Sequence, residues 1–354
     1  MVFLFRLGGK ETILLSLYGC SISTIAGVVI GDYYTLLLSR FLIGAFSGLN
    51  MAVHCIFMSE RMSSKQIFET SLLCLNLVFT FGGVWIPTLG YFLLDVVGWR
   101  FFVLLTSFPV FFPAILLLHF CVAGPLETSP DEEQEAVSEK IDSEGMDSEG
   151  MDSEDVIEVP NFIARLCKIS IFGVVVTYQG WGTILLLPAL IRLFNIKDVG
   201  QSDSNCDGIT QGWEFLLLAL VNAAADVGRV ANFLFRGKIR FRVVFTLLAA
   251  ATVASYSILF FYQDTLWIIV LTSFIVKLTY GIMAMESEYI SFDVNYFGSK
   301  MMSIGAGIAL GLSILGALAG TAIASFATPG IAALGGLAFN VIQVFNVLSM
   351  YERD

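Results

Sequence analysis

Charged residues are scarce in this sequence. Only 14% of the 354 residues are Asp, Glu, Lys or Arg, whereas 56% are hydrophobic and the mean hydropathy is +0.81. Soluble globular domains carry about 25% charged residues. The composition therefore excludes an ordinary soluble domain and indicates a protein that lies in a membrane.

Motifs for covalent chemistry are also absent. The sequence has no catalytic triad, Walker nucleotide-binding motif, His/Glu metal cluster or basic nucleic-acid-binding surface. Its six cysteines lack metal-ligand spacing and mostly lie in or beside apolar segments, so we interpret them as small buried hydrophobic residues. No signal peptide is evident. The sequence predicts no enzyme, no cofactor, no metal site, no ATP-driven pump and no nucleic-acid partner.

The negative charge is concentrated in one segment. The net charge is −11, but residues 127–158 contain 14 acidic residues and a single basic one, and the remainder carries a net charge of +2. This segment includes the tandem repeat IDSEGMDSEGMDSED and has few apolar residues. We predict a disordered, solvated linker over residues 125–164.

Apolar runs of about 20 residues, the length that crosses a bilayer as a helix, recur along the chain. Four runs precede the acidic linker and six follow it. The run at 67–94 contains Gly82, Gly83 and Pro87, so we expect a tilted or kinked helix there. The predicted fold is all-α, a polytopic membrane bundle of about ten helices. The expected spans are 12–30, 34–57, 67–94, 101–122, 167–190, 213–235, 243–262, 265–285, 302–325 and 330–349.

Lys and Arg are distributed unevenly between the loops. If the N-terminus is cytoplasmic, 13 of the 19 basic residues fall in cytoplasmic segments and three in loops on the opposite side. The other three, Arg40, Arg229 and Lys277, lie within spans. Because cytoplasmic loops carry the excess of basic residues, we predict that both termini and the acidic linker are cytoplasmic.

Two short basic turns containing glycine occupy corresponding places in the two groups of spans. The first is Arg6-Leu7-Gly8-Gly9-Lys10, before the first span, and the second is FRGKIRFR at 235–242. Internal repeats of this kind are common in transporters. Both turns resemble the D-R-x-G-R-R loop of the major facilitator superfamily, although the first lacks the aspartate and the second is looser still.

Further segments are similar to motifs of the same family. RFLIGAFSG, from Arg40 to Gly48, resembles the fourth-helix motif R-F-x-x-G-x-x-x-G, and Ser59-Glu60 resembles the pair that ends that helix. GWRFFVLLTSFPVF resembles the start of the sixth helix in the synaptic vesicle 2-related (SVOP-like) and organic ion transporter branches, and GPLETSP resembles a degraded P-E-S-P-R motif. In ESEYISFDVNYFGS, Glu288 matches the family glutamate, but Asn295 replaces its arginine, so we expect that cytoplasmic ion pair to be missing.

The resemblance implies two helix bundles joined by a cytoplasmic linker. The ten spans correspond to family helices 3 to 12, and helices 1 and 2 are expected to be absent. The implied domains are a truncated N-terminal bundle at 1–124, the linker at 125–164 and a six-helix bundle at 165–354. Residues expected to have structural or gating roles are Arg6, Gly8, Gly9, Lys10, Gly44, Gly48, Glu60, Asp226, Arg229 and Glu288.

Charges inside spans are costly and usually face a bundle interior or a cavity. Arg40 shares a helix face with Gly44 and Gly48, and the resemblance implies a role in substrate or proton coupling, against a structural arginine that snorkels or pairs. Asp226 and Arg229 are three residues apart, and we expect them to form a structural ion pair.

Lys277 has no matching acid on its own helix face, because Glu286 lies half a turn out of phase. It therefore needs a partner from another helix or a bound anion, unless it snorkels. Other candidates for substrate contact are aromatic and polar residues in spans whose family counterparts line the cavity, although packing explains them equally well. They are Tyr178, Gln179, Trp181 and Tyr280.

Two smaller features are expected to be structural. His54, near one end of its span, is more often a packing residue than a titrating one. The spaced glycines 307/311 and 316/320 are expected to allow close helix packing.

The sequence favours a secondary transporter of a small solute, in a plasma or intracellular vesicle membrane. The solute could be an organic ion, an anion more readily than a cation, and an ion or proton gradient would drive its alternating-access movement. Two alternatives stay open: a non-transporting vesicle-membrane paralogue that acts as a binding protein, and a fragment of a twelve-helix transporter.

Overall fold

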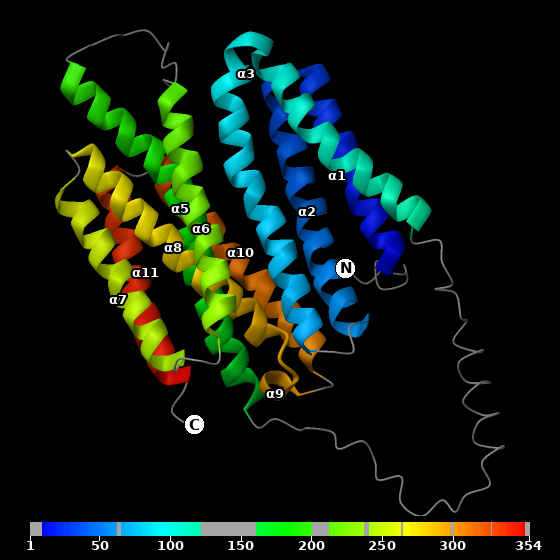
Figure 1. The fold of residues 1–354 in the computed structure, drawn as a ribbon, viewed down its shortest axis with the longest axis vertical. Helices are drawn as coiled ribbons and strands as arrows, with labels where there is room; N and C mark the ends of the chain where they lie inside the picture. Colours follow the sequence, from blue (N-terminus) through cyan, green and yellow to red (C-terminus); the bar gives the residue numbers. More distant parts are fainter. Residues whose placement is uncertain are drawn as a thin grey trace, which may run out of the picture. The chain divides into compact units, whose positions relative to one another are not determined.

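Every regular element in the described part of the computed structural model is a helix (Figure 1). The described residues are 9–61, 65–121, 161–199, 212–236, 241–262, 265–298, 301–326 and 328–350. The all-α fold class expected from the sequence is confirmed. The helices are α1 (Gly9–Ile30), α2 (Tyr33–Arg61), α3 (Lys65–Cys121), α5 (Phe162–Val199), α6 (Gly212–Phe235), α7 (Phe241–Phe261), α8 (Leu266–Ser291), α9 (Val294–Phe297), α10 (Met302–Phe326) and α11 (Pro329–Met350).

The expected spans coincide with these helices, and α3 contains two of them. Seven described segments are long and apolar enough to cross a membrane: Glu11–Ile30, Gln66–Ser107, Phe162–Ile191, Val243–Phe261, Leu266–Ser291, Ile304–Ser325 and Pro329–Met350. Helix α6 is not among them, and its sequence includes Glu214, Asp226 and Arg229. These charges make α6 more polar than the seven segments, and they require neighbouring helices that supply polar partners.

Helix α3 is interrupted at Gly98, which has φ 71° and ψ 159°. Only glycine adopts such a backbone conformation without strain. The break separates the spans expected at 67–94 and 101–122, and it lies outside the Gly82–Pro87 stretch where the sequence suggested a kink.

The chain divides into two compact units. Unit 1 comprises residues 1–57 and 97–157, and unit 2 comprises residues 58–96 and 158–354. In unit 1, α1 packs on α2, where a Cβ at Gly19 would meet the ring of Phe46. Asp32 caps α2, since Thr35 donates to its carboxylate from N at 2.7 Å and from Oγ1 at 2.6 Å. These hydrogen bonds lower the pKa of Asp32.

Unit 2 pairs α5 with α10, α6 with α8, and α7 with α11. Glycines bring the backbones of α5 and α10 into contact. A Cβ at Gly316 would strike the Val174 carbonyl, and one at Gly320 would lie 3.0 Å from Gly182 N, so this glycine pair packs as expected. The second predicted glycine pair, Gly307 and Gly311, does not form a close helix contact, because a Cβ at either position meets no described atom within 4 Å.

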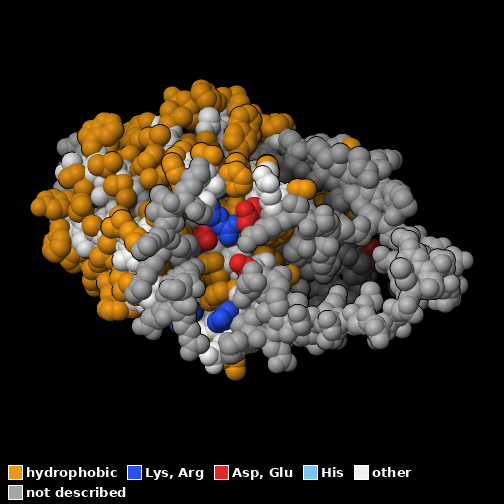
Figure 2. Space-filling model, turned by 60° about the horizontal axis from the view of Figure 1, so that its bottom comes forward, with side chains coloured by type: hydrophobic (Ala, Val, Ile, Leu, Met, Phe, Trp, Pro, Cys, Tyr) orange, Lys and Arg blue, Asp and Glu red, His pale blue; other side chains and the backbone are white. Residues whose placement is uncertain are grey.

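The surface of the described residues is largely hydrophobic. Trp267, Phe261 and Phe345 are 75%, 74% and 69% exposed. Figure 2 shows hydrophobic side chains over most of the described surface on one face, with acidic and basic side chains gathered in a small area. Large exposed apolar surface of this kind is matched by lipid rather than water, which agrees with an integral, multi-pass membrane protein.

Candidate functional site

Buried charges gather inside unit 2. Arg229 is 1% exposed, Lys277 2%, Glu286 6% and Glu288 8%. They lie on α6 and α8, two helices that cross at glycines. Because a charge inside a hydrophobic bundle is costly unless it has a partner or a function, this region is the candidate site.

Gly228 and Gly281 determine how closely α6 and α8 approach. A Cβ at Gly228 would collide with the Leu278 carbonyl oxygen, and one at Gly281 with the Ala225 carbonyl oxygen. The two backbones are therefore in direct contact, which larger residues would prevent. This crossing places Arg229 of α6 against Tyr280 of α8.

Two buried cations share the ring of Tyr280. Lys277 Nζ lies 5.2 Å from the ring centroid, and Arg229 Cζ lies 5.5 Å from it. Lys277 Nζ also donates a hydrogen bond of 2.7 Å to the carbonyl oxygen of Gly180 on α5. Gly180 leaves room for the ring, since a Cβ there would lie 2.5 Å from Tyr280 Cε2. We call Arg229, Lys277 and Tyr280 the cationic cluster.

Arg229 is only partly satisfied by its neighbours. Its Nη1 lies 3.7 Å from Asp226 Oδ1, which confirms the expected pairing of these residues. Nevertheless, Nε and Nη1 are buried and form no hydrogen bond to any described residue. Buried N–H groups without acceptors are costly and rare. The cationic cluster thus retains capacity to bind an acceptor.

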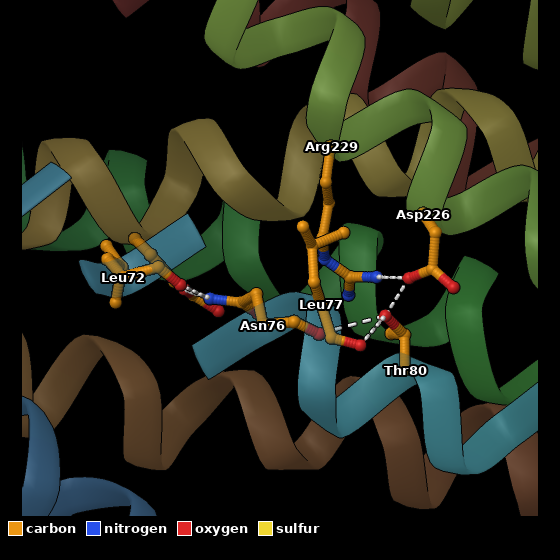
Figure 3. Close-up of polar contacts among 7 residues, drawn as sticks. Leu72, Asn76, Leu77, Thr80, Asp226 and Arg229 are labelled. Atoms are coloured by element: carbon orange, nitrogen blue, oxygen red, sulfur yellow. Dashed lines mark hydrogen bonds and ion pairs between the residues drawn. The ribbon is translucent and has the colours of Figure 1, made fainter. Parts of the chain in front are cut away.

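Polar contacts connect the 65–96 part of α3 to α6 and α8. Thr80 Oγ1 donates to Asp226 Oδ1, and Asn76 Nδ2 donates to Glu288 Oε2 at 2.5 Å. Asn222 Nδ2 donates to the Gly83 carbonyl oxygen at 3.0 Å. We call these three contacts the polar ladder. Figure 3 shows Asn76 and Thr80 on α3, with Thr80 directed toward Asp226 and Arg229 of α6.

A second set of contacts surrounds Arg236, just after α6. Its Nη1 pairs with Glu69 Oε1, its Nε lies 3.4 Å from Glu286 Oε2, and its Cζ lies 3.8 Å from the centroid of the Tyr289 ring. Asn232 also donates to Glu286 at 3.2 Å. We call this set the Arg236 network. It accounts for Glu286, which the helical periodicity had placed away from Lys277.

Only two of the six predicted substrate contacts meet in the structure. Lys277 and Tyr280 form the cationic cluster, whereas Tyr178 donates to the Ala332 carbonyl oxygen and Gln179 to Asn340, both on α11. Trp181 is 42% exposed. Successive residues of a helix point about 100° apart, so residues 178, 179 and 181 cannot all face one cavity.

Arg40 and its glycines belong to unit 1. Arg40 is exposed on α2, and a Cβ at Gly44 or Gly48 would meet no described atom within 4 Å. The close helix contact expected at these glycines is therefore not seen among the described residues. Several other predictions fall outside what the structure describes. Arg6 and Gly8 lie in undescribed residues, the surroundings of Gly9 are not described, and neither are the side chains of Lys10, His54 and Glu60.

Sequence reasoning missed Asn76, Thr80, Asn222 and Arg236 as members of the site. A usable signal was present for two of them, because Asn76 and Thr80 are polar residues four apart inside an apolar run. That spacing places them on one helix face, and in the structure both contact carboxylates of unit 2.

The comparisons with known proteins agree on one fold. The sequence model of the Major Facilitator Superfamily matches residues 3–320. A crystal structure of the human organic anion transporter MFSD10 (TETRAN) resembles the chain with a TM-score of 0.61. The match covers 96% of this chain and 77% of that chain at 16% identity, which shows similarity of fold. No curated protein sequence matches the chain significantly.

Proposed function

Since the chain belongs to the Major Facilitator Superfamily of membrane transporters, we propose that it is a secondary transporter of a small organic anion. The observation that carries this proposal is the cationic cluster. Two buried cations lie against one aromatic ring, and one of them has N–H groups with no hydrogen-bond acceptor among the described residues. No enzymatic step is invoked.

The chemistry of the cluster favours a carboxylate or a similar oxyanion. Guanidinium groups bind carboxylates through charge-assisted hydrogen bonds, and a lysine ammonium adds a second charge. Lys277 has a neutral carbonyl, Gly180 O, as its hydrogen-bond acceptor. The ring of Tyr280 offers an apolar surface for the organic part of a solute. A structurally similar protein is named an organic anion transporter, which supports the same class.

Charge balance favours coupling to a proton. Arg229 and Lys277 are offset by Asp226 and Glu288, the two carboxylates of the polar ladder. Entry of a monoanion into this low-dielectric region adds an uncompensated negative charge. Protonation of one ladder carboxylate would restore balance, so we propose that anion and proton move together.

Alternating access requires contacts that break during the cycle. The proposed halves are residues 1–124 and 165–354, with 125–164 as the linker between them. In that division the polar ladder and the Arg236 network join an N-terminal helix segment to the C-terminal half. We propose that both sets of contacts open when the protein changes state.

The orientation of the chain and its branch of the family are proposed from the sequence. We propose cytoplasmic termini and membership of the synaptic vesicle 2-related (SVOP-like) branch. With that orientation the Arg236 network, whose arginine belongs to the basic turn at 235–242, would lie on the cytoplasmic side and act as the inner gate. Arg40 was a coupling candidate from the sequence, but its exposure on α2 favours the structural alternative.

The experiment is uptake of radiolabelled small carboxylates into proteoliposomes that contain the full chain. Lys277→Gln and Arg229→Gln should each reduce uptake strongly, whereas Lys168→Gln serves as the matched control. Lys168 also donates to a backbone carbonyl, Ser349 O at 2.5 Å, but lies outside the cluster. Uptake of organic cations in preference to carboxylates, or uptake unchanged by both cluster variants, would contradict the proposal. Absence of uptake for every solute would favour the binding-protein alternative.

A further inference from the structure

A stripe of buried amides runs along α11 in a region that transport at the cationic cluster does not use. Asn340 and Gln343 are 0% exposed, and Asn346 is 8% exposed. Their spacing of three places them on one side of the helix. Gln179 of α5, also 0% exposed, reaches this stripe and donates to Asn340 Oδ1. We call Gln179, Asn340 and Gln343 the amide cluster.

The amide cluster is incompletely hydrogen bonded. Asn340 is well satisfied, since it accepts from Gln179 and donates to the Gly336 carbonyl oxygen at 2.7 Å. By contrast, Gln179 Oε1, Gln343 Oε1 and Gln343 Nε2 are buried and have no partner among the described residues. Two acceptor oxygens, one on α5 and one on α11, and one donor amide on α11 are therefore buried without a partner among the described residues.

These groups require a ligand that both donates and accepts hydrogen bonds. An unpaired buried amide is costly, and inside a membrane no lipid chain can satisfy it. No charged side chain belongs to the cluster, so the ligand is neutral. Water is the smallest molecule with both functions, and buried waters typically make about three hydrogen bonds to such groups.

Two further polar contacts join α5 and α11 between the cluster and the end of α11. Asn346 Nδ2 donates to the Lys168 carbonyl oxygen at 2.9 Å, and Lys168 Nζ donates to Ser349 O at 2.5 Å. Residues 346 and 349 continue along α11 from Gln343 toward its C-terminal end. Asn346 and Lys168 are thus polar groups that lie between Gln343 and the end of α11, beside the hydrophobic cluster that contains Ile169 and Val347.

We propose that the amide cluster is an internal water-binding site between α5 and α11. Water bridges Gln179 Oε1 and the amide of Gln343, and it enters past Asn346. The site is separate from the cationic cluster. Gly180, which binds Lys277 of α8, is the next residue after Gln179 on α5 and points about 100° away from it.

The first test is radiolytic hydroxyl labelling of the purified full chain in lipid nanodiscs, read by mass spectrometry. The reporters are Tyr178, which is 3% exposed, and Phe339, whose rings stack between the same two helices, α5 and α11, with centroids 4.5 Å apart. The control is Phe172, which is 0% exposed in a hydrophobic cluster. We expect labelling of Tyr178 at least about threefold faster than that of Phe172, allowing for intrinsic reactivity, and loss of the excess in Gln179→Leu/Gln343→Leu. Equal, low labelling at all three rings would overturn the proposal.

The second test compares two leucine variants of the same helix by thermal unfolding. Gln343→Leu should leave Tm nearly unchanged, because it replaces a water-bridged amide with an apolar side chain of similar size. Asn340→Leu should lower Tm by roughly 3 °C or more, because it strands the Gln179 N–H. An equal loss in both variants would mean that Gln343 has a direct protein partner, and would contradict a water site.

Discussion

The two units bury polar groups in different ways. In unit 1 the buried polar residues among those described carry hydroxyls. Three of these hydroxyls bond to their own helix: Ser16 to Ile13 O, Thr24 to Cys20 O and Ser39 to Leu36 O. In unit 2 whole charges are buried, including Arg229, Lys277 and Glu288. A hydroxyl that bonds to a carbonyl of its own helix needs no other helix as a partner, whereas a buried charge depends on other helices. This contrast is the reason why we propose that the transport chemistry lies in unit 2.

The two arginines within spans make the same contrast for a single residue type. Arg40 is exposed on α2 of unit 1, whereas Arg229 is 1% exposed and lies against Tyr280 in unit 2. Arginine with its charge at the surface can be satisfied by solvent or lipid headgroups. Arginine in the bundle interior can be satisfied only by protein or a bound solute.

Replacing each of these arginines with glutamine should give the largest difference in carboxylate uptake between the two units. Arg229→Gln should reduce the initial rate of carboxylate uptake by at least about tenfold, since a charge-assisted hydrogen bond contributes about 1.5–3 kcal/mol. Arg40→Gln should change it by less than about threefold. The measurement is uptake at equal amounts of folded protein in liposomes. A greater loss in Arg40→Gln than in Arg229→Gln would reverse the assignment of the site to unit 2.

The helix crossing in unit 2 should be sensitive to one methyl group. Gly281→Ala should destabilise the protein by about 1–3 kcal/mol, because the new Cβ meets the Ala225 carbonyl oxygen and neither backbone can yield. Gly307→Ala is the control, since a Cβ there meets no described atom within 4 Å. Thermal unfolding in detergent compares them. Similar Tm values for the two variants would show that α6 and α8 do not cross in direct contact.

Proton coupling should appear as a pH dependence that depends on Glu288. Carboxylate uptake should rise as the outside pH falls, toward a limit of about tenfold per pH unit for one bound proton. Glu288→Gln, which holds this position neutral, should weaken the dependence, and Glu11→Gln on α1 is a comparison in unit 1, where Glu11 is exposed. Uptake and internal acidification are measured together. Anion uptake without proton entry would refute the coupling.

The smallest effect is expected at Trp181. Its side chain is 42% exposed, away from Lys277 although only one residue beyond Gly180. Trp181→Phe should change the KM for a carboxylate by less than about twofold, whereas Tyr280→Ala should raise it severalfold by removing the shared ring. If Trp181→Phe proved the more damaging change, the solute would have to bind on the other side of α5.

The helices were predictable from the sequence because each span is an apolar run long enough to cross a bilayer. The pairing of Asp226 with Arg229 was predictable as well, since both residues lie on one helix three positions apart. The cationic cluster was only half predictable. Lys277 and Tyr280 share α8, but the approach of Arg229 depends on the contact between Gly228 and Leu278 O, which no local pattern encodes.

The candidates that the structure does not bring together were chosen for reasons of the same kind. Tyr178, Gln179 and Trp181 were grouped because they are close in sequence, but helical geometry sends them to different neighbours. Arg40 stood out because its glycine spacing matches a family motif, although no described residue fills the space beside Gly44. Which face of a helix meets a partner depends on tertiary packing, and composition alone does not determine it.

Equilibrium binding of a small carboxylate to the purified full chain tests the central claim most directly. Isothermal titration would compare the unmodified protein with Lys277→Gln, Arg229→Gln and the control Lys168→Gln. We predict that each cluster variant weakens the Kd by at least about tenfold and that the control leaves it unchanged. Equal affinity in all four proteins would contradict the assignment of the solute site to Arg229, Lys277 and Tyr280.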